Sequence, residues 1–183
     1  TTPKGYFELD DENEWKPFKD FENLPNIDFN DDNTRMLDLN GDGKSEVVVT
    51  EDNILTWYPS EGRNGYSQAQ KTIKSFDEEA GPSVVFADSK QTIFLADMSG
   101  DGMTDIVRIR NGEICYWPNL GYGKFGRKVT MDNAPIFDHP DYFNPSFLKL
   151  ADIDGSGTTD IIYLGKNKFS CWLNLNGNTF STT

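Results

Sequence analysis

The stretch LADMSGDGMTDIVRIRNGEICYW, from Leu95 to Trp117, contains the pattern that decides the fold of this chain. It begins with an acidic, glycine-rich loop, DMSGDGMTD. Two runs rich in β-branched and aromatic residues, DIVRIR and EICYW, follow the loop and predict strands. The Asn111-Gly112 pair between the two runs favours a tight type I′ hairpin. The stretch therefore predicts a unit made of an acidic loop, a strand, a turn and a second strand.

This unit occurs three times. The acidic loops are DLNGDGKSE (38–46), DMSGDGMTD (97–105) and DIDGSGTTD (152–160), and they begin at nearly even intervals along the chain. Such a period is typical of propeller blades. Short strands (TRML, TIFLA and FLKLA) precede the loops, and weaker strands near residues 15–18, 71–75 and 128–131 bring each repeat to four. The sequence thus predicts an all-β chain of three four-stranded antiparallel β-propeller blades, with repeats at approximately residues 6–66, 67–126 and 127–183.

Each acidic loop places oxygen-bearing side chains at loop positions 1, 3, 5 and 9, and glycines at positions 4 and 6. This arrangement predicts a cage for a hard divalent cation, and calcium fits better than magnesium, which demands near-ideal octahedral geometry. We therefore expect up to three structural calcium ions. The candidate ligands are the side chains of Asp38, Asn40, Asp42, Glu46, Asp97, Ser99, Asp101, Asp105, Asp152, Asp154, Ser156 and Asp160, with the backbone carbonyls of Lys44, Met103 and Thr158.

The loops differ from EF-hands, which need a bidentate acidic residue at position 12 and flanking helices. Position 12 is Val49, Arg108 or Tyr163, and strands are predicted on both sides. The alternative of an acidic turn without metal is less favoured, because three copies share one register. Ser156 at position 5 and Glu46 at position 9 depart from the pattern, so the second loop is the most regular.

Composition narrows the classes of function. The net charge is -13 and the isoelectric point is near 4.4, which argues against nucleic acid and anionic membranes as partners. No apolar run is long enough to span a membrane, and the given sequence has no positively charged start with an apolar core that would resemble a signal peptide. Because the chain opens with TTPKGY and not with Met, we expect it to be a piece of a longer protein. The single histidine, His139, has no recognisable nucleophile partner, so we expect no catalytic activity.

Aligning the copies places Trp57, Tyr116 and Trp172 in one column, for which packing between blades is predicted. Cys115 and Cys171 are placed in a shared column as small buried residues, too far apart for a disulfide. Three long segments connect the strands: ENLPNIDFNDDN (22–33), DEEAGPSVVFADSKQ (77–91) and DNAPIFDHPDYFNPS (132–146). Loops on a rigid scaffold often carry recognition, so we expect partner surfaces there.

The acidic repeats resemble the FG-GAP or VCBS repeats of integrin-like propellers. Three longer strings go further: LADMSGDGMTDIVRIRNGEICYWPNLGYGKFG, KVTMDNAPIFDHPDYF and LADIDGSGTTDIIYLG. They resemble the middle region of the insecticidal toxin complex B component, which is related to the Salmonella virulence plasmid B protein. The resemblance extends from about Trp15 to Phe180.

This resemblance implies a secreted or extracellular module of a much larger, shell-forming protein. In that family the propeller docks on a channel-forming A component and gates it, while the shell is completed by a C component. The alternative function is an integrin-like, calcium-dependent adhesion or glycan-binding propeller. Because three repeats are fewer than a closed propeller needs, we expect an exposed apolar blade edge, and either an open arc or pairing with a second copy.

Overall fold

The computed structural model describes residues 4–88, 90 and 92–182. Ser89 and Gln91, in one predicted recognition segment, and Thr183, at the end of the third repeat, lie outside the described residues. The described part of the chain is all-β and contains two short 3-10 helices, Gly62–Asn64 and Pro145–Phe147, but no α-helix. Among these residues no helix is long and apolar enough to cross a membrane.

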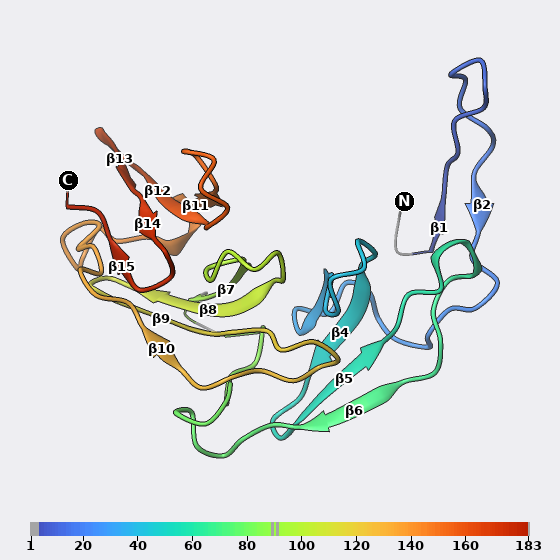
Figure 1. The fold of residues 1–183 in the computed structure, drawn as a ribbon, viewed down its shortest axis with the longest axis horizontal. Helices are drawn as coiled ribbons and strands as arrows, with labels where there is room; N and C mark the ends of the chain where they lie inside the picture. Colours follow the sequence, from blue (N-terminus) through green and yellow to red (C-terminus); the bar gives the residue numbers. More distant parts are fainter. Residues whose placement is uncertain (1–3, 89, 91, 183) are drawn as a thin grey trace.

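Three antiparallel sheets lie side by side in an arc, with β1 and β2 at one end and the third sheet at the other (Figure 1). The first sheet consists of β3 (Thr34–Leu37), β4 (Glu46–Thr50), β5 (Ile54–Tyr58) and β6 (Gln70–Ile73). The second consists of β7 (Ile93–Ala96), β8 (Asp105–Arg110), β9 (Glu113–Trp117) and β10 (Val129–Thr130). The third consists of β11 (Leu148–Ala151), β12 (Asp160–Gly165) and β13 (Lys168–Trp172). In each sheet the strands follow one another in chain order, which confirms the predicted blades as part of a larger propeller.

Two smaller elements flank the sheets. Strands β1 (Gly5–Tyr6) and β2 (Lys19–Asp20) form a separate hairpin that projects from the first sheet (Figure 1). The strand predicted near residues 15–18 therefore pairs within this hairpin, through a bridge between Leu9 and Trp15, and belongs to no blade. Strands β14 (Asn174–Leu175) and β15 (Thr179–Phe180) close a turn after the third sheet.

The sheets are offset from the sequence repeats. The strand predicted at 71–75 appears as β6 and pairs with β5 of the preceding unit, and the strand predicted at 128–131 appears as β10 and pairs with β9. Strands β6 and β10 begin at the same separation in sequence after the position 9 acid of the preceding loop: Gln70 follows Glu46 as Val129 follows Asp105. The third sheet has three strands among the described residues, one fewer than the four predicted.

Hydrophobic clusters join the sheets face to face. Val48 and Trp57 of the first sheet pack with Ile106 and Trp117 of the second, and all four are at most 3% exposed. Burial of one such side chain contributes about 1.5–3 kcal/mol, so these contacts hold neighbouring blades together. Because successive strand residues point to opposite faces, the residues adjacent to Ile106 and Trp117 on β8 and β9 face the third sheet.

The second junction follows the same rule. Val107 and Tyr116, on the other face of the second sheet, pack with Ile161, Tyr163 and Trp172 of the third. The register places Tyr58, Trp117 and Trp172 at equivalent positions, opposite Val47, Ile106 and Ile161. The predicted column of Trp57, Tyr116 and Trp172 is therefore wrong by one position at Trp172. The expected packing role is correct for all three.

The two cysteines are also not equivalent. Cys115 lies opposite Arg108 and Cys171 lies opposite Ile162, so their side chains belong to opposite faces of their sheets. Both are free thiols; Cys115 is buried and Cys171 is half-buried. The shared column fails because Cys171 lies one position farther from Asp160 than Cys115 lies from Asp105. The two turns have equal length, since Gly165 pairs with Lys168 as Arg110 pairs with Glu113.

The long connecting segments pack between the sheets. Phe29 lies against the cluster that contains Val47, Phe86 belongs to the cluster of the first junction, and Phe137 belongs to that of the second. Phe137 is fully buried and contacts Trp172 edge-on, with 5.3 Å between ring centroids. These segments, predicted as recognition loops, thus contribute part of the core, while their remaining residues stay largely exposed.

Candidate metal centre

Each acidic loop connects the first and second strands of a sheet, and its backbone has one shape. The glycines at loop positions 4 and 6 all have positive φ, between 75° and 90°. Side chains rarely adopt this region, which explains why glycine occurs at both positions. The clearest cases are Gly43, Gly102 and Gly157, around which a Cβ atom would meet no neighbour within 4 Å. Backbone conformation rather than crowding therefore requires glycine there.

The carboxylate at loop position 1 organises the turn. In the third loop, Asp152 accepts hydrogen bonds from the N–H groups of Gly155 at 2.8 Å and Gly157 at 3.0 Å, one on each oxygen. Asp38 and Asp97 accept the equivalent pairs of bonds in the first and second loops. These bonds fold the loop around the carboxylate and leave its remaining lone pairs pointing into the turn.

The carboxylate at position 9 is a buried clamp. Asp160 is fully buried, and its two oxygens accept the N–H groups of Ile153 at 2.8 Å and Asn174 at 2.7 Å. Asp105 does the same with Met98 and Asn119, and Glu46 with Leu39 and Ser60. In every copy the second donor follows the acid at the same separation in sequence. The clamp therefore joins the loop to the chain that leaves the second strand of the hairpin.

Burial raises the pKa of two of these clamps. Desolvation raises the pKa of Asp105 to about 6, although the N–H groups of Asn119, Met98 and Ser99 favour the charged form. Desolvation also raises the pKa of Glu46, against the hydrogen bonds from Leu39 and Ser60. A nearby cation would offset this desolvation and keep the carboxylates ionised.

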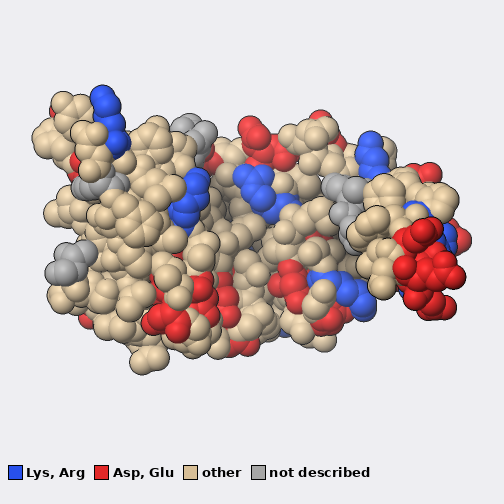
Figure 2. All heavy atoms as spheres, turned by 90° about the horizontal axis from the view of Figure 1, so that it is seen from above, with Lys and Arg blue, Asp and Glu red and all other residues tan. Residues whose placement is uncertain are grey.

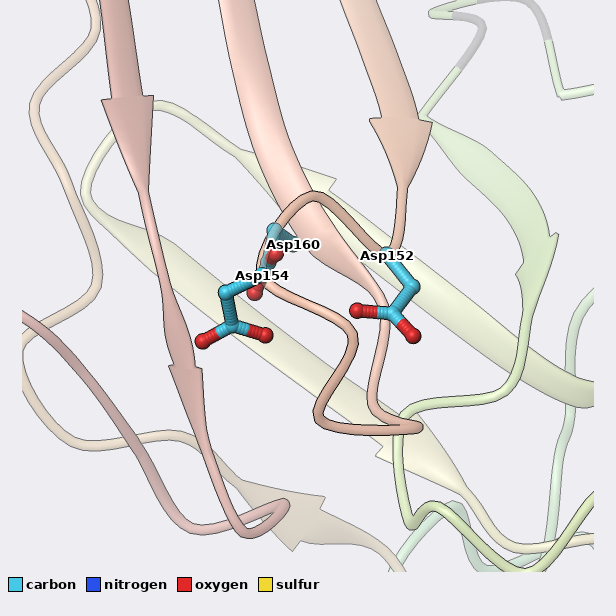
Figure 3. Close-up of side chains that lie close together, drawn as sticks. All are labelled: Asp152, Asp154 and Asp160. Atoms are coloured by element: carbon cyan, nitrogen blue, oxygen red, sulfur yellow. The ribbon is translucent and has the colours of Figure 1, made fainter.

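The third loop brings its carboxylates together. Asp152, Asp154 and Asp160 each offer an oxygen, and these oxygens all lie within 4.8 Å of one another (Figure 3). Calcium binds oxygen at 2.3–2.6 Å, so two ligands of one ion lie at most about 5 Å apart. Asp154 is exposed, and its pKa is lowered first by the hydroxyl of Ser156. The residues present therefore fit a calcium ion at the third loop.

The first and second loops do not gather three carboxylates in this way among the described residues. In the first loop the Lys44 ammonium lies 3.2 Å from Asp42, so a protein cation occupies the neighbourhood of one candidate ligand. In the second loop Asp101 accepts the N–H of Met103 at 2.9 Å. Sequence regularity favours the second loop, but the geometry favours the third.

Two features near the loops were not identified from the sequence. Asn174 donates from its side chain to the carbonyls of Met98 at 2.9 Å and Thr159 at 3.2 Å, so it ties the third sheet to the second loop. The Thr159 N–H also donates to the Asp97 carbonyl at 2.8 Å. The column that contains Asn174 could have been found by taking an equal step from each position 9 acid, which leads to Ser60, Asn119 and Asn174.

The second missed feature is a charge network between the connecting segment and the second sheet. Arg108 is 7% exposed and pairs with Glu78 at 2.8 Å and with Glu113 at 3.2 Å. Lys128 also pairs with Glu78, at 3.1 Å.

Acidic side chains elsewhere gather in separate groups, one of them at the end of the molecule that carries β1 and β2 (Figure 2).

No protein-family model matches the chain, and no curated protein matches it. Among solved structures, the chain is similar to a chain in the Tc holotoxin pore of Photorhabdus luminescens, with 28% identity and a TM-score of 0.79. That similarity covers 97% of this chain and 8% of the other, so the chain spans a small part of the length of that relative. The alignment with a crystal structure of TcdB2-TccC3 without its hypervariable C-terminal region covers 81% of this chain and 12% of the other, with 16% identity and a TM-score of 0.49.

A lectin of Agrocybe aegerita is also similar, with 22% identity and a TM-score of 0.56. The alignment covers 81% of this chain and 36% of the lectin, whose structure describes recognition of non-reducing terminal N-acetylglucosamine. At this level of identity the likeness shows the fold alone. Among solved structures, the chain is thus similar to Tc toxin complex components and, in fold alone, to one lectin.

Proposed function

We propose that this chain is a non-catalytic, calcium-braced propeller module of a secreted, toxin-complex B-type protein, and that it serves docking and gating during toxin assembly and delivery. The observation that carries the proposal is the similarity to the Tc holotoxin pore chain over 97% of this chain. The all-β arc of packed sheets supports it, because a rigid scaffold with exposed loops suits protein docking.

Calcium acts as a brace in this proposal. At the third loop Asp152, Asp154 and Asp160 would hold the ion, whose positive charge offsets repulsion among the three carboxylates. Asp160 also clamps Ile153 and Asn174, so a cation held there would stabilise the link between the loop and the end of the hairpin. The first and second loops are weaker candidates, because within the described part of the chain their carboxylates do not come together in this way.

The test of function is a binding comparison. The immobilised 183-residue chain is incubated with a purified channel-forming A component of a Tc-type complex, with its C component, and separately with a glycan array. The proposal expects saturable binding to a toxin component and no glycan selectivity. Selective glycan binding without binding to either component would instead support the adhesion or lectin alternative.

A further inference from the structure

An extended segment seals the edge of a unit at two places in this chain, once between the β1–β2 hairpin and the first sheet and once between the second and third sheets. Asn23 forms a parallel bridge with Gly65 of the first unit, and Asp132 forms the same bridge with Thr179 of the third. Gly65 and Thr179 follow the position 9 acid of their own loops by equal steps along the sequence. In both places the sealing segment is the chain that leaves an outer or flanking strand. The junctions are therefore sealed in an equivalent way.

Two backbone hydrogen bonds hold each seal. The N–H of Asn23 donates to the Asn64 carbonyl at 3.0 Å, and the N–H of Tyr66 donates back to the Asn23 carbonyl at 3.0 Å. Asp132 makes the same pair with Asn178 and Phe180, at 2.8 and 3.1 Å. An extended backbone thus adds to the edge of the loop, as in β-strand addition.

The junction between the first and second sheets lacks this seal. The residue at the equivalent step after Asp105 is Lys124, and among the described residues no bridge joins it to the segment after β6. The atoms equivalent to the bonded pair are the Gly123 carbonyl and the Phe125 N–H. Within the described part of the chain, neither of these two atoms has a backbone hydrogen-bond partner.

The cause is the length of β6. It has four residues where β10 has two, and the Lys74 N–H continues the ladder by donating to the Asn53 carbonyl at 2.9 Å. The Lys74 ammonium is also held, by the Val84 carbonyl at 2.7 Å. The chain therefore stays on the first sheet through Lys74 and reaches the second sheet only at Glu78 and Glu79, whose carbonyls accept the Trp117 Nε1–H at 2.7 Å and the Lys128 N–H at 3.1 Å.

A groove of about 350 Å³ lies where the seal is absent. One wall is formed by Thr72–Ser75 and another by Leu120 with Gly123–Phe125, while Leu55 and the connecting segment at Ala80–Pro82 complete the lining. Apolar side chains stand exposed beside it: Ile73 is 77% exposed and Leu120 is 61% exposed. The groove thus combines unpaired backbone with an apolar rim, which are the two features that strand addition uses.

We propose that this groove binds an extended peptide segment of a protein partner, with apolar side chains and an acidic residue. The segments at the two sealed junctions indicate the chemistry of such a peptide. Each of them buries an apolar residue, Phe21 or Met131, and carries an acid, Glu22 or Asp132. No acid lines the open groove, and its exposed charged residue is Lys124, since Lys74 is buried with its ammonium held by the Val84 carbonyl. In a chain of net charge -13, this favours an acidic strand.

The inference goes beyond the proposed function, because it requires neither calcium nor a toxin component. A synthetic peptide with the sequence DFENLPNIDF, copied from residues 20–29, serves as the probe. It is labelled and titrated with the full chain by fluorescence anisotropy, in chelator, beside a scrambled peptide of the same composition. Hydrogen exchange at the Phe125 amide reports where the peptide binds.

The variant pair is Leu120→Asp and Leu175→Asp. The two leucines hold equivalent positions after their position 9 acids and both are exposed, but Leu175 lies at the sealed junction. We expect saturable binding of the probe but not of the scrambled peptide, slower exchange at Phe125, and at least tenfold weaker binding for Leu120→Asp alone. Equal binding by both variants, or no binding to the parent chain, would overturn the proposal. Dimers that dissociate in Leu120→Asp would also overturn it, since a second copy would then be the occupant.

Discussion

The buried acid at loop position 9 is the residue on which each blade depends most. Asp160 accepts two backbone N–H groups in a fully buried site, and each buried donor left without a partner costs about 1–3 kcal/mol. We expect Asp160→Ala to lower the free energy of unfolding by about 3 kcal/mol in chelator, measured by urea denaturation. Asp154→Ala, at an exposed position of the same loop, should change it by less than about 1 kcal/mol. Equal losses in the two variants would contradict the clamp.

Glu78 is expected to make the folding stability of the chain depend on pH in the acid range. Its hydrogen bond from Arg108 lowers its pKa from 4.5 to about 2. A lowered pKa contributes stability that is present above the ordinary value and is lost as pH falls toward the folded value. We expect the parent chain to lose more stability between pH 5 and pH 3 than Glu78→Gln does, by urea midpoints. Glu12→Gln, at the exposed hairpin turn, should follow the parent, and identical pH profiles for all three proteins would count against this role.

At the scale of residues, the sequence identifies the acidic loops but not the different roles of their carboxylates. The spacing of Asp152, Asp154 and Asp160 predicts a cation cage, and the structure brings these three carboxylates together. The pattern treats position 9 as one more ligand. It cannot show that this residue is buried and bonded to an N–H beyond the next strand, because that contact depends on how the hairpin folds back.

At the scale of elements, the close contact between the second and third sheets depends on a glycine. A Cβ at Gly177 would lie 2.8 Å from the Tyr116 hydroxyl and 3.1 Å from the Met98 carbonyl, and φ is +75°. Gly121 has a similar φ of +81° but no neighbour within 4 Å. Gly177→Ala should therefore destabilise the chain more than Gly121→Ala, by about 1–2 kcal/mol in chemical denaturation. A loss of the same size in both would show that the contact contributes nothing.

The sequence predicts the strands better than their partners. Alternation and the Asn111-Gly112 pair correctly predict the hairpin of β8 and β9, but the expected type I′ turn is wrong, because Gly112 has positive φ and Asn111 does not. The outer strands at 70–73 and 129–130 are also found, yet the repeat boundaries place them with the following unit, whereas they pair with the preceding one. Local composition contains no information on which edge a short strand will join. The position of Trp172 was wrong by one place for a different reason: the two hairpins have turns of equal length, so an equal step from Asp105 and Asp160 places Trp172 with Trp117 and not with Tyr116.

At the scale of the whole molecule, the third sheet exposes the face that the second sheet buries. Ile109 and Ile114 of the second sheet are fully buried against the third. Their counterparts on the third sheet, Leu164 and Phe169, are 44% and 70% exposed. Each sheet buries the same face against its successor, so the far face of the third sheet is the expected contact of another blade. This agrees with a module that forms part of a larger ring.

The measurement that tests the central claim most directly is thermal unfolding of the chain with calcium and with chelator. With calcium at about ten times the dissociation constant, one site adds about 1.4 kcal/mol, which corresponds to a midpoint increase of about 3–6 °C. We expect this increase to saturate, to be smaller with magnesium, and to disappear in Asp154→Asn, which keeps the buried clamp intact. A midpoint that calcium leaves unchanged would contradict the account of the acidic loops as calcium braces.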